Sequence, residues 1–288
     1  MPAAGPAPAL RRMVHISRPV LWINTLGPGV LGMWLTGLLL RWEAVPLLLW
    51  LTLPFNLLIY GVNDIFDQDT DALNPRKGSL EGARIRASEV RTIWVSVLAA
   101  NLPFALWFAL ALPPAALGWI ALYVLVFVFY SAPPLRFKAR PFLDSLSNAA
   151  YALPLVVLAY ALGDTPVWPA ALGLMAWSVA KHAFDAVQDI EEDRAVGITT
   201  TAVRLGARGT GWWSGAWWAV SVLGFALVSV PVAVVNALIA GWLVVSLLRA
   251  PAPATGHRLY RHSIAFPYVA GTVAGVQLAG ALILGRYP

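Results

Sequence analysis

The chain has 288 residues, of which 59% are hydrophobic, with a mean hydropathy of +0.70 and a formal net charge of +6. A soluble core does not need so much apolar surface, so we predict an all-α polytopic membrane protein. The absence of Cys excludes disulfides, thiolate metal sites and Cys nucleophiles. The positive charge fits the collection of Lys and Arg on the cytoplasmic side of membrane proteins, and we expect no nucleic-acid partner.

The first residues are rich in Pro and Ala and lack the apolar core of a cleavable signal, so residues 1–12 are expected to be a disordered tail. Residues 13–288 are expected to form a single domain of nine transmembrane helices around a central cavity. The apolar segments long enough to span a bilayer are 17–40, 46–68, 90–112, 115–131, 142–162, 167–190, 209–229, 232–249 and 263–285.

Basic residues gather before the first expected helix and in the loops after the second, fourth, sixth and eighth. The other side of the membrane has only Arg41 and Arg286. This asymmetry predicts a multi-pass protein of the cell (plasma) membrane, surrounded by membrane lipid, with its N-terminus in the cytoplasm. The second and sixth helices then both end at the cytoplasmic face.

Two acidic clusters close the second and sixth expected helices. The first cluster is Asp64, Asp67 and Asp71, and the second is Asp185, Asp189 and Asp193. If each helix continues through its cluster, these spacings place the carboxylates of a cluster on one helical face. Acidic residues at a helix C-terminus oppose the macrodipole, and carboxylates at a membrane edge are costly, so both clusters need a cation.

Oxygen-only ligand sets suit Mg²⁺, whereas the sequence has no Cys/His spacing typical of zinc sites. Arg76 and Lys77 follow the first cluster, and Lys181 lies one turn before Asp185. Carboxylates, a divalent metal and flanking bases together indicate a diphosphate-binding site on the cytoplasmic side. The off-face carboxylates Asp69, Glu191 and Glu192 fit a solvated helix end instead.

Three other classes of protein are open at this point. A cation-coupled transporter also places carboxylates in a helical bundle, but at mid-membrane near broken helices rather than at span ends beside long basic loops. A CDP-alcohol phosphotransferase needs a single long acidic motif with a Gly-x-x-Ala-Arg element, which is missing. A purely structural or lipid-binding protein leaves the two clusters unexplained.

The motifs Asn63-Asp64-x-x-Asp67-x-x-x-Asp71 and Asp185-x-x-x-Asp189, with SRPVLW at the first helix and YSAPPLRFK after the fourth, resemble the intramembrane (UbiA-type) prenyltransferases. The resemblance spans nearly the whole chain. It implies a UbiA-like fold and Mg²⁺-dependent transfer of a prenyl group from a prenyl diphosphate to a lipophilic acceptor. The residues it carries over as Mg²⁺–diphosphate residues are Asn63, Asp64, Asp67, Asp71, Asp185 and Asp189, and its phosphate contacts are Arg136 and Lys138.

Within that family, the stretches YGVNDIFDQDTDALNPRKGSLEG, DSLSNAAYALP and HAFDAVQDIEEDRAVGITTTAVRLG resemble the lycopene elongase branch of carotenoid biosynthesis. Asp185 departs from that branch, in which we expect a small residue. The acceptor is therefore expected to be a carotenoid, with an aromatic acceptor of the quinone or chlorophyll type as the alternative.

The resemblance assigns roles to the remaining candidates. Asp64, Asp67, Asp185 and Asp189 are expected to be catalytic through the metal, and the flanking bases, Lys181 included, to take up charge on the leaving diphosphate. Aromatic faces near the motifs, such as Tyr130, could shield an allylic cation. Asp144 opens the segment 142–162 and has two open roles, orienting a water or base, or capping a helix.

Overall fold

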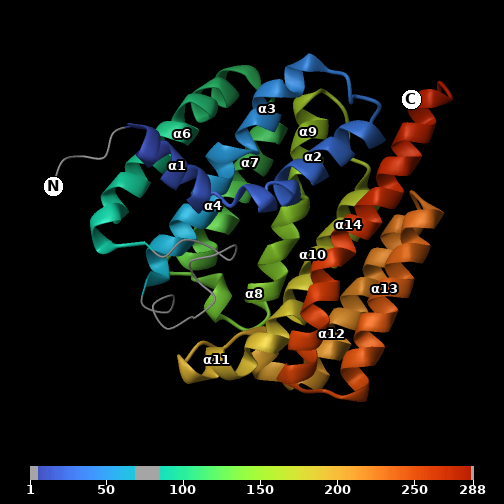
Figure 1. Cartoon of the computed structure of the whole chain (residues 1–288). Helices are drawn as coiled ribbons and strands as arrows, with labels where there is room; N and C mark the ends of the chain where they lie inside the picture. The colour runs from blue at the N-terminus through green and yellow to red at the C-terminus, as the bar shows by residue number, and fades with distance from the viewer. Residues whose placement is uncertain (1–5, 69–84, 287–288) are drawn as a thin grey trace. The chain divides into compact units, whose positions relative to one another are not determined.

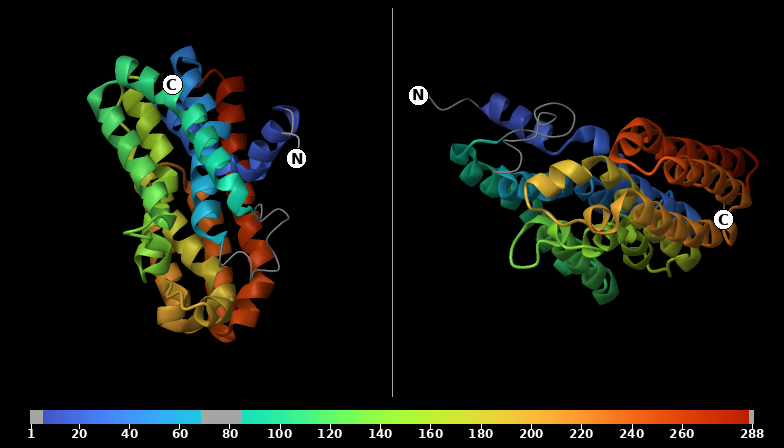
Figure 2. Two further views of the ribbon diagram at one scale, coloured as in Figure 1. Left: turned by 90° about the vertical axis from the view of Figure 1, so that its left-hand side faces the viewer. Right: turned by 90° about the horizontal axis from the view of Figure 1, so that it is seen from below.

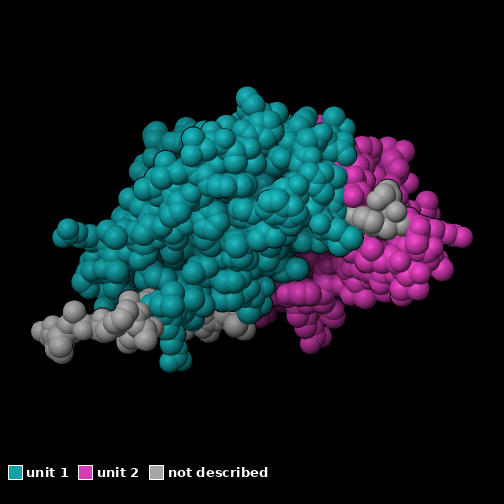
Figure 3. All heavy atoms as spheres, turned by 90° about the horizontal axis from the view of Figure 1, so that it is seen from above, with its two compact units in different colours: residues 1–33, 38–136, 153–165 teal, residues 34–37, 137–152, 166–288 magenta. Residues whose placement is uncertain are grey.

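The computed structural model describes residues 6–68 and 85–286. All the regular elements in these ranges are helices, which confirms the predicted all-α class. The helices form two compact units, each described below by itself, and the single domain expected for residues 13–288 stays a prediction. The first unit is 1–33, 38–136 and 153–165, and the second is 34–37, 137–152 and 166–288 (Figure 3).

The first unit is built from hydrophobic helices whose Pro residues stand mostly in first turns, where a missing N–H costs nothing. Its helices are α1 (Pro6–Ile16), η1 (Pro19–Leu21), α2 (Ile23–Leu35, which runs past the unit's border), η2 (Trp42–Ala44), α3 (Val45–Trp50), α4 (Leu53–Phe66), η3 (Ala87–Glu89), α6 (Val90–Ala111), α7 (Pro114–Ser131) and α9 (Leu153–Ala161) (Figure 1). Its core holds an aromatic cluster in which the ring centroids of Phe55 and Tyr123 lie 4.2 Å apart.

In the second unit, the three longest helices, α12 to α14, run side by side (Figures 1 and 2). Its helices are η4 (Phe137–Ala139), α8 (Leu143–Leu146), η5 (Ser147–Ala152), α10 (Trp168–Asp185), η6 (Ala186–Asp189), α11 (Ile190–Ala195), α12 (Thr201–Ala226), α13 (Val230–Arg249) and α14 (Pro253–Ile283). Phe184, Trp218 and Phe266 are the large buried side chains of its core.

Each of the nine expected apolar segments contains a helix in the described residues. Six helical stretches are long and apolar enough to cross a membrane: Trp42–Phe66, Ala87–Ala111, Pro114–Ser131, Leu143–Ala161, Val230–Arg249 and Pro253–Ile283. The chain is therefore a multi-pass membrane protein, and the count of nine spans stays a prediction. The remaining segments correspond to the 13-residue α2, to α10, which carries Lys181 and Asp185, and to α12, which is kinked at Gly206 (φ 66°).

The second expected span is interrupted rather than continuous. α3 ends at Trp50, and α4 restarts with Pro54 in its first turn. The backbone carbonyl of Leu51 at this break accepts hydrogen bonds from Thr25 Oγ1 (2.7 Å) and from Asn56 Nδ2 (2.8 Å), both buried. Side chains of α2 and α4 thus satisfy a group that the break exposes, as an apolar environment requires.

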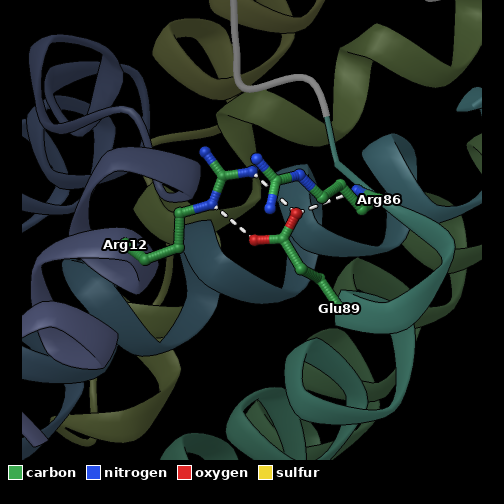
Figure 4. Close-up of polar contacts among 3 residues, drawn as sticks. All are labelled: Arg12, Arg86 and Glu89. Atoms are coloured by element: carbon green, nitrogen blue, oxygen red, sulfur yellow. Dashed lines mark hydrogen bonds and ion pairs between the residues drawn. The ribbon is translucent and has the colours of Figure 1, made fainter. Parts of the chain in front are cut away.

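Residues 6–12, expected to be disordered, form most of helix α1. The helix is anchored because Arg12 forms a bidentate ion pair with Glu89, with N–O distances of 2.9 and 3.1 Å (Figure 4). Glu89 also accepts the backbone N–H of Arg86 at 2.8 Å, at the start of η3. The Pro/Ala-rich composition alone suggested a disordered tail. The contact with Glu89, 77 positions away, could not be predicted from that composition.

Glycine at position 224 allows α10 and α12 to approach closely. A Cβ there would lie 2.7 Å from the carbonyl oxygen of Pro169 and 2.8 Å from Cα of Gly173. Because both neighbours are backbone, Gly224→Ala is expected to lower the free energy of unfolding by about 1–3 kcal/mol, measurable by thermal unfolding in detergent. The matched control is Gly241→Ala in α13, where nothing lies within 4 Å and stability should not fall. Equal effects of the two substitutions would contradict this account of Gly224.

Candidate active site

The first acidic motif lies at the C-terminal end of α4. Asp64 is fully buried, and Asp67, which caps the helix, is 8% exposed. A buried carboxylate is stable only if a cation or several donors compensate its charge. The position is therefore built to hold positive charge.

Arg18 supplies one such charge; sequence reasoning counted it as a base before the first helix and as part of SRPVLW, but did not pair it with Asp64. Its Nη2 donates to Asp64 Oδ1 at 2.7 Å, and its guanidinium carbon lies 4.4 Å from the ring centroid of Tyr60. Tyr60 and Asp64 are one turn apart on α4, so a single guanidinium contacts both. Arg18 adopts a left-handed backbone conformation (φ 52°, ψ 70°), uncommon for a residue with a Cβ, between α1 and η1.

Asn63 is fixed by a neighbouring helix. Ser131, the last residue of α7, donates its hydroxyl to Asn63 Oδ1 at 2.7 Å. Tyr130 is the half-buried residue before it, and Arg136 follows with a positive φ of 40°. The first unit therefore gathers Asn63, Asp64 and Asp67 at the end of α4, with the end of α7 against Asn63. Three further predicted residues, Asp71, Arg76 and Lys77, lie outside the described residues.

The second acidic motif does not form one continuous α-helix. α10 ends at Asp185, a 3₁₀ turn (η6) covers 186–189, and α11 begins at Ile190. Lys181, one turn earlier, donates to Asp185 Oδ2, and Ser263 of α14 donates its hydroxyl to Asp185 Oδ1. Ser263 is fully buried. Sequence spacing could not indicate this residue, which is 78 positions away.

Asp193 in α11 faces the start of α12. Thr200, the N-cap of α12, donates its hydroxyl to Asp193 Oδ2 at 3.3 Å. Burial and, after it, the negative charge of Asp189 raise the pKa of Asp193 to about 6, while the hydrogen bond from Thr200 acts in the opposite direction. Asp189 and Asp193 thus repel each other, which is the electrostatic condition that a divalent cation relieves.

Asp144 contacts the start of α12. The carboxylate is fully buried and accepts both the backbone N–H of Thr201 (2.9 Å) and the Thr201 hydroxyl. A carboxylate at the N-terminus of α12 is also favoured by the helix dipole. The same Thr201 Oγ1 accepts the backbone N–H of Phe142 at 2.7 Å, so the contact fastens the turn before α8 to α12. Lys138 lies in η4, a few residues earlier.

The donor set of both motifs fits Mg²⁺ chemically. The ligand atoms on offer are carboxylate oxygens, Asp64 and Asp67 are buried, and burial together with the charge of Asp189 raises the pKa of Asp193. Within 6–68 and 85–286, no group of three or more His, Cys, Asp or Glu side chains could hold a metal ion by itself. Each motif therefore offers a partial ligand set in these ranges, and Mg²⁺ binding to this chain stays a proposal.

Residues 25–266 match the UbiA prenyltransferase family, and the chain belongs to this family. The lycopene elongase/hydratase of Haloferax volcanii is 41% identical over 245 residues, which cover 82% of this chain and 79% of that protein. The lycopene elongase/hydratase of Corynebacterium glutamicum (strain ATCC 13032) is 35% identical over 205 residues, 69% of this chain and 71% of that protein. The chain is thus a prenyltransferase of the carotenoid branch, as its motifs indicated.

Solved structures confirm the fold. The UbiA homologue from Archaeoglobus fulgidus bound to GPP and Mg²⁺ has a TM-score of 0.67 and 21% identity, covering 91% of this chain and 99% of that chain. A digeranylgeranylglyceryl phosphate synthase has a TM-score of 0.68 and 13% identity, covering 92% of this chain and 97% of that chain. The nine-helix count and the central cavity stay predictions.

Proposed function

We propose that this chain, with Mg²⁺, transfers a prenyl group from an allylic prenyl diphosphate to a carotenoid acceptor such as lycopene. The observation that carries the proposal is the similarity, over at least two thirds of both chains, to two proteins named lycopene elongase/hydratase. The structure supports it with two carboxylate motifs, one at the end of α4 and one around η6. The similar structure with GPP and Mg²⁺ supports the choice of donor substrate and metal.

The aspartates of the two motifs are proposed to hold Mg²⁺. They are Asp64, Asp67, Asp71, Asp185, Asp189 and Asp193. Bound Mg²⁺ would supply charge neutralisation for the diphosphate. Asn63, its amide oriented by Ser131, contributes a polar contact beside Asp64. The bases near the motifs are proposed to stabilise the negative charge that grows on the leaving diphosphate; they are Arg76, Lys77, Arg136, Lys138 and Lys181.

The reaction then follows from the substrates. The allylic C–O bond breaks, and the diphosphate leaves with the bonding electron pair. A terminal alkene of the acceptor attacks the allylic carbon to form the new C–C bond, and the resulting cation loses a proton or captures water and then loses a proton. Tyr130 is proposed to face the allylic cation, since aromatic rings stabilise positive charge without reacting with it. The hydrogen bonds that Asp144 accepts from Thr201 favour a structural role for it over the orientation of a water or base.

The site and the N-terminus are proposed to lie on the cytoplasmic side of the plasma membrane, because Lys and Arg gather in the loops of that side. The chain has no Cys, so single Cys residues can be introduced and labelled from one side at a time. A Cys in place of the exposed Glu191 should be labelled only from the cytoplasmic side. Labelling from the outside would contradict the orientation.

Pigment analysis tests the proposed acceptor. Expression in cells that make lycopene is expected to convert it to a longer carotenoid, detected by chromatography and mass spectrometry. The control is the Asp189→Asn variant, which should leave lycopene unchanged. Unchanged lycopene together with a newly prenylated quinone would contradict the carotenoid acceptor and favour the aromatic acceptor instead. If labelled prenyl diphosphate enters no lipid while purified chain in vesicles conducts cations, the transporter class would be favoured instead.

A further inference from the structure

The first turns of α14 carry an exposed group of bases. His257, Arg258 and Arg261 line a pocket of about 350 Å³, and all three side chains are exposed. We call these three residues the α14 basic patch. Cationic side chains that converge on one hollow attract an anion, and Arg in particular suits a phosphate, because its planar fork of N–H donors matches two phosphate oxygens.

The positive charge of the patch is not balanced by a carboxylate in the part of the chain that the structure describes. Arg258 Nη2 donates to Thr255 Oγ1 at 3.2 Å, and Arg261 Nε donates to His262 Nε2 at 3.3 Å. Both acceptors are uncharged in these contacts. The sequence also has no Asp or Glu after Asp193, so neither α12, α13 nor α14 can supply an anion.

The length of α14 places the patch at the level of the lipid headgroups. The helix has 31 residues and is therefore roughly 46 Å long, whereas the hydrocarbon core of a bilayer is about 30 Å thick. Residues 263–283 carry no charged side chain and alone reach about 31 Å. Residues 253–262, which include the patch, thus extend beyond the hydrocarbon.

The patch continues into an exposed apolar surface. Arg261, Ile264 and Tyr268 stand at i, i+3 and i+7 and share one face of α14. Ile264 is 44% and Tyr268 51% exposed, whereas Leu259 and Ser263 are buried on another face. The outer face of α14 therefore combines bases at headgroup level with apolar side chains at the depth of the acyl chains.

The neighbouring helix α13 supports this placement (Figure 1). The rings of Trp242 in α13 and His262 in α14 meet edge to face, with centroids 5.1 Å apart, and Trp242 is 49% exposed. Exposed Trp side chains are typical of the membrane–water interface. Arg249, the last residue of α13, is also exposed and adds a further positive charge at this end of the two helices.

We propose that the α14 basic patch binds an anionic phospholipid of the adjacent leaflet. Arg258 and Arg261 donate to its phosphate, and its acyl chains lie along Ile264 and Tyr268. The site is separate from the acidic motifs, because Ser263, which contacts Asp185, belongs to the buried face of α14. The inference needs only the membrane location of the chain, so it stands apart from the metal and from the prenyl acceptor.

Lipid selectivity beside the patch tests the proposal. The chain has no Cys, so Val269→Cys places one fluorophore on the outer face of α14. The labelled chain in phosphatidylcholine vesicles is titrated with a quenching, spin-labelled lipid, either phosphatidylglycerol or phosphatidylcholine. Phosphatidylglycerol is expected to associate at least about fivefold more strongly, because two bases near the surface favour an anionic lipid. Adding Arg258→Gln/Arg261→Gln should bring this ratio close to one.

The matched control is Arg41→Gln/Arg286→Gln, which removes two positive charges elsewhere and should keep the ratio of the parent chain. Equal association of the two lipids with the parent chain, or an equal fall of the ratio in both double variants, would overturn the proposal.

Two further measurements use the parent chain and so do not depend on the folding of a variant. Raising NaCl from about 0.05 M to about 1 M should bring the ratio close to one, because salt screens the bases. A ratio unchanged by salt would contradict an electrostatic site. At constant ionic strength, about 10 mM inorganic phosphate should leave the ratio as it is. If phosphate abolished the ratio, the patch would be a site for soluble phosphates, and the lipid assignment would be wrong.

Discussion

Replacing Asp64 or Asp189 by Asn is expected to reduce kcat for prenyl transfer by about a thousandfold or more. Each substitution keeps the size of the side chain and removes the negative charge that we propose binds Mg²⁺. The charge matters most at Asp64, which is fully buried, because an electrostatic contact weakens little there through solvent screening. Transfer of label from a prenyl diphosphate into extracted lipid measures the loss.

The control for this prediction is Glu191→Gln, two residues after Asp189, at an exposed carboxylate that we expect to be solvated. That variant should keep wild-type activity. EDTA should abolish activity in the wild type, and added Mg²⁺ should restore it. Full activity of Asp64→Asn or Asp189→Asn, or turnover in EDTA, would rule out the metal-dependent reaction.

The helical architecture could be predicted because its signal is local. An apolar run of span length identifies a membrane helix without knowledge of its neighbours, and each expected segment does contain a helix. The same reasoning misplaced features set by contacts between distant residues. The break between α3 and α4 depends on Thr25 and Asn56, which satisfy the carbonyl of Leu51. Helix α1 is joined to the start of α6 by the ion pair of Arg12 with Glu89 and buries Met13 and Ile16.

The candidate site also has features that local sequence predicts and features that depend on distant residues. The identities of the carboxylates could be read from their spacing, but their roles could not, because spacing assumes an unbroken helix. The 3₁₀ turn after Asp185 invalidates that assumption for the second motif. Lys181 was expected beside Asp185 because four residues make one helical turn, whereas Ser263 and Thr200 come from other helices.

Arg18 is the clearest omission of sequence reasoning, since it precedes Asp64 by 46 residues. Counting bases treats every Arg before a first span as a marker of the cytoplasmic side. The sequence did indicate that an aspartate at a membrane edge needs a cation. The only bases considered for that role were those that follow the motif, Arg76 and Lys77. A base earlier in the chain, between α1 and η1, satisfies the same requirement.

Arg18→Met is expected to destabilise the chain by about 3–5 kcal/mol, because it removes the guanidinium that contacts the buried carboxylate of Asp64. The pair is enclosed, with Asp64 fully buried and the Arg18 side chain 12% exposed. Thermal unfolding in detergent, without Mg²⁺, measures the change. The double variant Arg18→Met/Asp64→Asn should recover a large part of the loss, since it removes the carboxylate charge as well.

The matched control is Arg41→Met, which removes the Arg from a second Arg–carboxylate pair of the protein. Arg41 and Glu43 are also in contact, at 3.0 Å, but their side chains are 48% and 39% exposed. Water solvates the Glu43 carboxylate once Arg41 is gone, so no measurable loss is expected. A loss at Arg41 as large as that at Arg18 would show that general surface charge, and not the enclosure of Asp64, sets the effect. A large loss at Arg18 alone would instead show that α4 depends on a cation beside Asp64 even when no metal is bound.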